Sequence, residues 1–431
     1  MRPKKQGDGG QKDLFRIRLD EMINMQHALV KLAGLIDWDR LHNTFAPYYK
    51  EHGRPGVPIQ MILGLHFLKH IYGLSDEEVC ARWVDNPYFQ YFCGESFFQF
   101  IFPMERSSLS HFRNRIDPQE LEKVLQESLH AAFKGGSLRL KDLKKVVVDT
   151  TVQDKAIAQP TANGLLLKAI EKVGTVAKQV GIKLRQSYVR VAKNAAIKVG
   201  RYIHAKQMKR ARKSLKYMKV RLGRLIRDVC RKSETLCETA QKKLQNVIKK
   251  AKKIHQQQRG DKGYLYAWHA PEVECISKGK ARAPYEFGCK VSFATQLKAS
   301  GGGKHYVLGA KAFHGAPYDG HTLKDALDQI ETIVGKCPGR SYVDKGYRGH
   351  KLKGKGQIII SGQKRGVTPN IKREMKRRSV IEPIIGHAKN DGLLGRNYLK
   401  GQRGDQMNAI LSAVGFNFRQ LLAYLHETAA A

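Results

Sequence analysis

Two apolar stretches of the chain end in an aspartate. The valines at 146–148 are followed directly by Asp149, and the pair at 342–343 is followed by Asp344. An aspartate that closes a buried strand either forms a turn or holds a metal ion. If the two strands are parallel neighbours, both carboxylates emerge at the same carboxyl edge of one sheet. The pattern therefore makes Asp149 and Asp344 candidate ligands that meet only in the folded chain.

A third acid, Glu382, lies in the helical stretch "MKRRSVIEPIIGHAKNDGL". Arg378 precedes it by four residues and Lys389 follows it by seven, so all three side chains fall on one face of a continuous helix. The neighbours of Glu382 are mostly isoleucine and valine, an apolar setting in which an acid needs a partner. Pro383 is a difficulty, because proline begins a helix comfortably but kinks one that is already running.

Three carboxylates without a histidine triad or zinc-spaced cysteines form a ligand set for hard divalent cations. Two such ions, about 3.5–4 Å apart, would flank a phosphate group. One would activate water or a 3′-hydroxyl as the nucleophile, and the other would stabilise the leaving oxygen. Each acid is ambiguous when it is taken alone. The set of Asp149, Asp344 and Glu382, in the order strand, strand and helix, is much more specific.

Four other polar residues near these acids have simpler interpretations. Asp319 precedes a helix and is expected to be a cap or turn residue rather than a ligand. Asp154 is expected to be solvated, and His387 to be an ordinary surface histidine. Arg348, four residues beyond Asp344, is a candidate for a phosphate contact.

The charge of the chain points to a polyanionic partner. Among 431 residues, 78 Lys and Arg stand against 38 Asp and Glu, which gives a formal net charge of +40. Residues 168–259 contain 28 of these cations and only four acids, with apolar residues at helical intervals. This block predicts a helical hairpin or small bundle whose basic faces contact a nucleic-acid backbone without reading its sequence. A solvated lysine surface is the alternative, and a ribosomal or histone-like binder would be equally basic.

The remaining patterns divide the chain into helical and β regions. Residues 1–140 read as helices, with Ser75 and Glu78 forming a capping box. The segment "ERSSLSHFRNRI" carries Arg113 and Arg115 and could place a helix in a DNA groove, or serve in packing or dimerisation. Strand patterns follow at about 284–362, interrupted by an amphipathic helix at about 321–334, and the chain is helical again from about Asn370.

The cysteines and the N-terminus indicate a cytoplasmic protein. The seven cysteines are scattered, none forms a Cys-x-x-Cys pair, and no Cys/His cluster has zinc spacing, so we expect thiols in a reducing compartment. The first twelve residues are polar and charged, and no run of eighteen apolar residues occurs, so neither export nor membrane insertion is expected.

At this point the sequence resembles a known family over nearly its whole length. The order Asp149, "VDKGYRG" around Asp344, and Glu382 with Lys389 resembles the DDE transposases of bacterial insertion sequences, in particular the insertion-sequence-five group. The stretches "VVVDTTVQDKAIAQPT", "CISKGKARAPYEFGCKV" and "HGAPYDGHTL" are similar to segments of such proteins. "HGRPGVPIQMILGLHFLKHIYGLSDEEV" is similar to their N-terminal helical domain.

The resemblance implies an α/β fold, with a ribonuclease-H-like mixed sheet flanked by helices. It implies a helical DNA-binding or dimerisation domain over residues 1–140. A catalytic domain over residues 141–425 would follow, interrupted by the basic helical insertion at about 160–283. An insertion of this length is tolerated because the entropy of loop closure grows slowly with loop length.

The resemblance also implies an activity and its partners. Asp149, Asp344 and Glu382 would be both the catalytic residues and the ligands of two Mg²⁺ ions, with Mn²⁺ as a substitute. Arg378 and Lys389 would position DNA, whereas Met375 stands where the family has an accessory tyrosine. The substrates would be the terminal inverted repeats of the element and target DNA. Because two ends must be cut together, we expect a homodimer on DNA, in the bacterial cytoplasm and associated with the nucleoid.

Two other functions remain open at the level of sequence. One is a structure-selective nuclease of the same fold, which hydrolyses DNA without strand transfer. The other is an inactive, transposase-derived protein that binds DNA through its basic surface.

Overall fold

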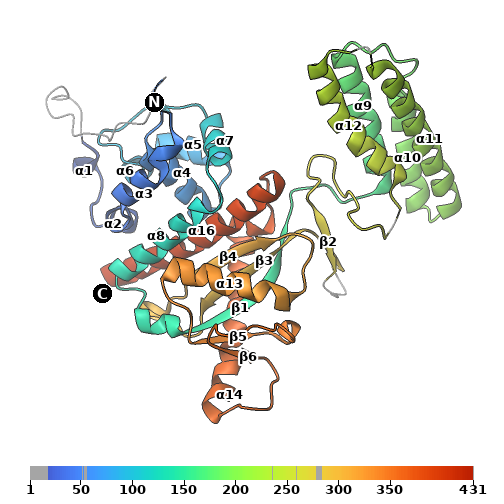
Figure 1. Cartoon of the computed structure of the whole chain (residues 1–431). Coiled ribbons are helices and arrows are strands. Elements are labelled where there is room, and N and C mark those ends of the chain that lie inside the picture. The colour runs from blue at the N-terminus through green and yellow to red at the C-terminus, as the bar shows by residue number, and fades with distance from the viewer. Residues whose placement is uncertain are drawn as a thin grey trace. The chain divides into compact units, whose positions relative to one another are not determined.

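The computed structural model describes residues 18–50, 52, 56–234, 236–258, 260–277 and 284–430. The chain forms two compact units (Figure 1). Unit 1 consists of Met1–Asp154 and Cys289–Ala431, and unit 2 consists of Lys155–Gly288. Unit 2 is thus an insertion within the sequence of unit 1.

A mixed sheet runs through the protein in the order β2-β3-β1-β5-β6, with β4 paired to β3. β1 and β5 are parallel neighbours, as are β5 and β6, whereas β3 is antiparallel to both β2 and β4. β2 pairs with the first residues of β3 inside unit 2. The strands are β1 (Lys145–Asp154), β2 (Glu274–Ser277), β3 (Tyr285–Gln296), β4 (Val307–Phe313), β5 (Arg340–Val343) and β6 (Gln357–Ile360).

Helices surround this sheet in unit 1 and share its hydrophobic core. One continuous cluster of buried side chains extends from Ala28 to Leu425. The N-terminal helices and the sheet both contribute side chains to this cluster. The helices are α1 (Leu19–Met22), α2 (Ala28–Leu35), α3 (Trp38–Phe45), α4 (Ile59–Tyr72), α5 (Asp76–Asp85), α6 (Pro87–Phe92), α7 (Ser107–Arg115), α8 (Glu120–Lys134), α13 (Asp319–Val334), α14 (Pro369–Lys376), α15 (Ile381–Asn390) and α16 (Gly401–Ala430).

The long helix α16 is the element that joins the two parts of this core. It packs against α2, α4 and α8 from the N-terminal part and against β4 of the sheet. Ile410, Val414, Phe418 and Leu421 are fully buried along it, at the helical spacing of an apolar face. The C-terminal helix therefore completes a core that begins about 380 residues earlier in the chain.

Local signals explain several of the helix boundaries. Ser75 accepts a hydrogen bond from the backbone of Glu78, and the Glu78 carboxylate accepts one from the Ser75 backbone, which confirms the predicted capping box. Helix α13 ends at Gly335, whose φ of 77° lies in the left-handed region that glycine adopts without strain. Among the described helices, none is long and apolar enough to cross a membrane.

Gly415 is required by the close approach of α16 to α4. A Cβ atom at this position would collide with the backbone and side chain of His70. We predict that Gly415→Ala lowers the free energy of unfolding by about 2 kcal/mol, because backbone atoms cannot move aside as a flexible side chain can. Gly34→Ala is the matched control in an exposed part of α2 with no atom nearby, and it should stabilise slightly. Urea unfolding of both variants checks this, and equal effects would contradict the packing argument.

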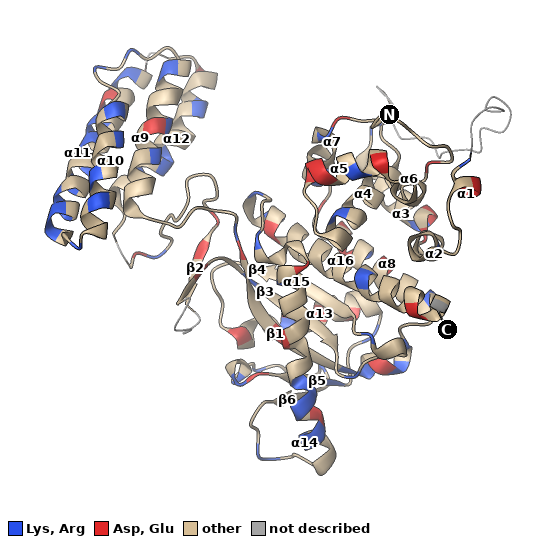
Figure 2. Ribbon diagram, turned by 180° about the vertical axis from the view of Figure 1, so that it is seen from behind, with Lys and Arg blue, Asp and Glu red and all other residues tan. Residues whose placement is uncertain are grey.

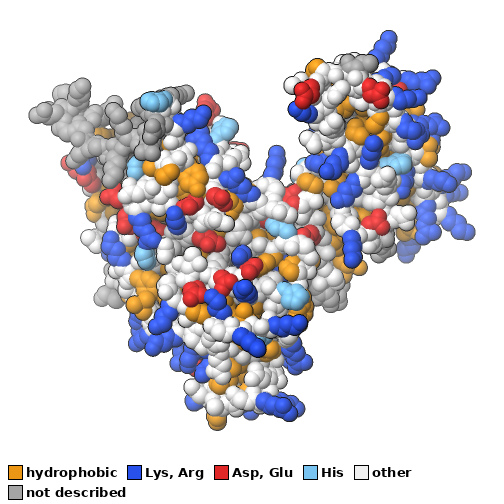
Figure 3. Space-filling view, in the orientation of Figure 1, with side chains coloured by type: hydrophobic (Ala, Val, Ile, Leu, Met, Phe, Trp, Pro, Cys, Tyr) orange, Lys and Arg blue, Asp and Glu red, His pale blue; other side chains and the backbone are white. Residues whose placement is uncertain are grey.

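Unit 2 is built around four helices with a hydrophobic core of their own. These are α9 (Ala162–Gln179), α10 (Val189–His204), α11 (Met208–Ser233) and α12 (Glu238–Gln256). Met218, Leu222, Leu225 and Val229 are buried on one face of α11, as their spacing predicts. The other faces carry Lys and Arg, which gather on the outside of the bundle (Figures 2 and 3). The basic block is therefore a folded bundle and not a charged tail.

Candidate functional site

The register of β1 and β5 brings the two strand-ending aspartates together. Lys145 pairs with Arg340, Val146 with Ser341 and Val147 with Tyr342, a constant offset along the two parallel strands. The same offset places Asp344 beside Asp149, just beyond the last paired residues. Val146 to Val148 and Val343 are fully buried, so the strands are anchored in the core and deliver the acids at its edge.

A buried acid at the opposite end of these strands fixes the register. Glu374 of α14 is only 3% exposed, and its carboxylate accepts hydrogen bonds from Lys145, Arg340 and Tyr342. Burial alone would raise the pKa of Glu374, but these donors lower it to about 2. Because Glu374 binds the first residues of both β1 and β5, it opposes a slip of one strand against the other.

Glu382 reaches the same edge from a helix that begins later than the sequence predicted. A short 3-10 turn, Arg377–Val380, precedes α15, which begins at Ile381. Pro383 therefore lies in the first turn of α15, where a backbone N–H has no partner within the helix, a position that proline tolerates. Arg378 belongs to the 3-10 turn, so the predicted continuous helix is interrupted, but Arg378 and Glu382 still contact each other four residues apart.

Arg378 nevertheless links all three acids. Its guanidinium nitrogens lie 3.4 Å from Oδ2 of Asp149, 3.7 Å from Oδ1 of Asp344 and 3.5 Å from Oε1 of Glu382. The Arg378 side chain is 17% exposed, whereas that of Glu382 is 63% exposed. The predicted carboxylates thus surround one cation at the rim of the sheet.

The chemistry of these donors fits a hard divalent cation, which the three carboxylates would bind through oxygen. All three residues are described, and their oxygens do not all lie within 4.8 Å of one another. The guanidinium of Arg378 lies among them instead. A metal ion bound by the same oxygens would displace Arg378.

Asp149 is the acid most affected by its surroundings. Burial raises its pKa to about 6, a change opposed by the hydrogen bond from the Thr150 backbone and by the charge of Arg378. The negative charges of Asp344 and Asp319 raise the pKa further. A carboxyl group that titrates near neutral pH binds a cation and a proton competitively in the physiological range.

Asp319 is the first residue of α13, at the helix start as the sequence predicted, but its side chain does not cap the helix. The residue before α13 makes no side-chain cap either. Its carboxylate accepts a hydrogen bond of 2.8 Å from the Thr150 hydroxyl and one of 2.8 Å from the Lys290 ammonium. Both donors come from strands, β1 and β3. No local spacing in the sequence could have indicated this contact, because it joins segments far apart in the chain.

The other predicted residues near the acids lie in different settings. Lys389 is 20% exposed and lies 3.9 Å from the Asp154 carboxylate, at the far end of β1 from Lys145. Asp154 is therefore an ion-pair partner rather than a purely solvated acid. Arg348 is exposed just after the short turn that follows Asp344. Met375, at the family's tyrosine position, packs partly buried against the main core.

Of the two arginines predicted on α7, only Arg115 is accessible. Arg113 is 9% exposed, and its guanidinium donates two hydrogen bonds to Asp76, with Lys69 on the same carboxylate. Arg115 is exposed and lies with its guanidinium carbon 5.6 Å from the centre of the Tyr49 ring. The fold thus gives Arg113 an internal partner and leaves Arg115 facing outward.

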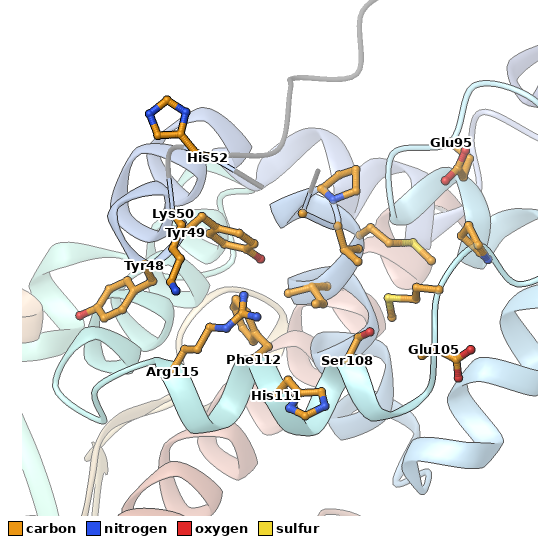
Figure 4. Close-up of a pocket in the computed structure, with 17 residues that line it drawn as sticks. Tyr48, Tyr49, Lys50, His52, Glu95, Glu105, Ser108, His111, Phe112 and Arg115 are labelled. Carbon is orange, nitrogen blue, oxygen red and sulfur yellow. The ribbon is translucent and has the colours of Figure 1, made fainter. Parts of the chain in front are cut away.

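Arg115 lines a cavity in unit 1 with a volume of about 980 Å³ (Figure 4). Lys50, His111 and Ser108 also line it, together with the acids Glu95 and Glu105. The cavity lies among the N-terminal helices and contains none of the three clustered carboxylates. The cavity is lined by charged hydrogen-bond donors, by the neutral donor Ser108 and by apolar side chains that include Phe112.

Comparison with known proteins places the chain in a class. Residues 17–115 match a family model described as a transposase domain (DUF772). With the mixed sheet and the clustered acids, this match defines a transposase-like α/β protein.

The chain is also 50% identical over 207 residues to the uncharacterized protein ORF8 in the nfe locus of Rhizobium meliloti. The matched region covers the whole of that protein and 48% of this chain. The chain belongs to the same family as the Rhizobium protein. No solved structure matches it.

Proposed function

We propose that this protein is a DDE transposase with a ribonuclease-H-like catalytic sheet. The observation that carries the proposal is the convergence of Asp149, Asp344 and Glu382 on the single guanidinium of Arg378. The strand arrangement supports it, because β1 and β5 are parallel and end in acids at one edge. The transposase-domain match of the N-terminal helices supports the same class of function from an independent part of the chain.

The three carboxylates would hold two Mg²⁺ ions, or Mn²⁺ in their place. When bound, such ions supply Lewis-acid activation of the nucleophile and neutralise charge on the phosphate. Arg378 would leave the carboxylates as the ions enter and would face the phosphate with its guanidinium. Asp319, which is held by Thr150 and Lys290, would keep the segment after Asp149 in place.

The proposed reaction has two phosphoryl transfers. In the first, a water oxygen bonds to phosphorus at the end of the mobile DNA element. The bond from phosphorus to the 3′-oxygen breaks, and a 3′-hydroxyl is released. In the second, that 3′-hydroxyl attacks a phosphodiester of target DNA, and the 3′-oxygen of the target strand leaves. Neither transfer requires a covalent bond to the protein.

The substrate of this proposal is double-stranded DNA with terminal inverted repeats. Arg348 and Lys389 flank the acids in the sequence and would contact the backbone, and Arg115 would contribute from α7. The basic helices of unit 2 would add contacts that do not depend on sequence. Cutting two ends together would require a homodimer on DNA, and such an enzyme would act at the bacterial nucleoid in the cytoplasm.

The experiment that tests the proposal compares DNA substrates with and without the inverted repeats of the element. We expect cleavage that requires Mg²⁺ or Mn²⁺, stops with a chelator, and is followed by joining of the 3′-end to a target duplex. Cleavage without joined products would favour the structure-selective nuclease. Binding without cleavage in either metal would favour the non-catalytic DNA-binding protein, and either result would overturn the transposase assignment.

A further inference from the structure

A second group of metal-ligating side chains lies away from the three acids, where β3, β4 and α16 meet. Among the described residues, Cys289, His314 and Asp405 are the one group of three or more such residues whose ligand atoms all lie within 4.8 Å of one another. The sulfur, nitrogen and oxygen donors come from three segments that are distant in the sequence. For this reason the spacing of cysteines and histidines gave no indication of the group.

The sheet register brings the first two donors together. β3 and β4 pair antiparallel, with Lys290 opposite Phe313. The next position along the same register places Cys289 opposite His314. Residues directly opposite each other in such a pair have Cβ atoms about 4.5–5.5 Å apart. The cysteine and the histidine are thus neighbours because of the fold itself, not because of a flexible loop.

Helix α16 supplies the third donor in a fixed orientation. Asp405 is 3% exposed, and its Oδ2 lies 3.0 Å from Nε2 of His314. Its other oxygen, Oδ1, accepts a hydrogen bond of 2.7 Å from the amide of Asn397, which is fully buried. Metal-binding carboxylates are held in this way by outer residues that fix their direction.

A buried network around Cys289 completes the setting. The Gln153 amide donates to Sγ of Cys289 at 3.6 Å and to the Asp405 backbone carbonyl at 3.0 Å. Asn408 in turn donates to the Gln153 side chain at 2.9 Å. Cys289 is 1% exposed, so a thiolate here would be shielded from bulk solvent, whereas His314 is partly open to it.

We propose that Cys289, His314 and Asp405 bind a zinc ion. One thiolate, one imidazole and one carboxylate at mutual ligand distance match the mixed sulfur, nitrogen and oxygen preference of Zn²⁺, and not that of Mg²⁺. Water would take the fourth position, from the side of the partly exposed His314. The ion would link the start of α16 to β3 and β4. One of its ligands, Cys289, is the first residue of unit 1 after the insertion.

The proposed site is independent of the three acids and of the proposed transposase activity. No donor of the zinc group is shared with Asp149, Asp344 or Glu382. Metal content and spectra therefore test the zinc site without reference to DNA cleavage.

Metal analysis of the full-length protein, purified without added chelator, tests the proposal. We expect about one zinc per chain, and on replacement by Co²⁺ a thiolate-to-cobalt charge-transfer absorption. Cys289→Ser should remove that absorption and His314→Ala should remove the zinc, whereas Cys237→Ser, at an exposed cysteine of unit 2, should retain both. Asn397→Ala removes the amide that orients Asp405, together with its hydrogen bond from the Leu399 backbone, and should weaken zinc binding by about 10- to 100-fold.

The wild-type protein provides the decisive measurement even if a variant fails to fold. Wild-type protein that takes up no zinc, or binds Co²⁺ without a sulfur absorption, would overturn the proposal. The same conclusion would follow if Cys289→Ser, folded by circular dichroism, bound zinc as tightly as the wild type. Asp149→Asn should leave the zinc content unchanged, which separates this site from the carboxylate cluster.

Discussion

Replacing any one of the three clustered acids by its amide should abolish DNA cleavage. For Asp149→Asn, Asp344→Asn and Glu382→Gln we expect the cleavage rate in Mg²⁺ to fall by at least about 10³-fold, equivalent to about 4 kcal/mol of barrier. The amide keeps the size of each side chain but removes the negative charge that would hold a divalent cation. The measurement is single-turnover cleavage of inverted-repeat DNA at saturating protein.

Two controls separate lost chemistry from lost folding or lost DNA binding. Asp325→Asn changes an exposed carboxylate of α13 that lies 3.7 Å from Lys311, and it should cleave at the wild-type rate. Gel-shift affinity for the same DNA should stay within a few-fold in all four variants. Cleavage at the wild-type rate by Asp344→Asn or Glu382→Gln would remove that residue from the proposed metal set.

Metal binding can also be followed without DNA, through the competition between Mg²⁺ and Arg378 for the same oxygens. A ligand that binds only the folded state raises its stability with concentration. Removing the guanidinium in Arg378→Ala should enlarge the rise in melting temperature produced by Mg²⁺, because the ions no longer displace a bound cation. The three amide variants should show a smaller rise than the wild type.

Sequence reasoning could propose Asp149 and Asp344 because each follows a pattern that is local. A run of buried valines ending in Asp149 is visible in ten residues, and so is the strand that ends in Asp344. Their proximity depends on strand pairing, which the constant register of β1 and β5 establishes and Glu374 stabilises at the other end. Glu374 itself could not be selected from the sequence, since its partners Lys145 and Arg340 are distant in the chain.

The errors share a physical cause, which is that tertiary contacts override local patterns. The sequence predicts Asp319 to be a cap or turn residue, but its carboxylate accepts hydrogen bonds from Thr150 and Lys290. Arg113 resembles an exposed basic residue of a DNA-contacting helix, but Asp76 pairs with it in the interior. The contacts of α16 with α2, α4, α8 and β4 likewise join segments that are distant in the sequence, and no local pattern indicates them.

Asp149→Asn should stabilise the protein at neutral pH while it abolishes cleavage. The pKa of Asp149 is raised to about 6 by burial, so the folded state retains a proton that the unfolded chain has already lost between about pH 4 and pH 6. The stability contributed by that proton is fully present below the unfolded pKa and is lost as the pH rises through the folded pKa. At pH 7.5 without divalent cations, the ionised carboxylate therefore costs up to about 3 kcal/mol, which the neutral amide avoids.

The sign of this effect distinguishes Asp149 from an ordinary ion-paired acid of the same protein. Burial would raise the pKa of Asp76, but Arg113 and Lys69 hold that pKa well below the usual range of an aspartate. Asp76→Asn should therefore destabilise the protein at pH 7.5, and its effect should shrink as the pH is lowered toward the range where a free aspartate protonates. Urea midpoints at pH 4.5 and pH 7.5, both in a chelator, measure the two variants. If Asp149→Asn lost stability at pH 7.5 relative to pH 4.5, as Asp76→Asn should, the Asp149 carboxylate would be stabilised by Arg378 more than it is penalised by burial.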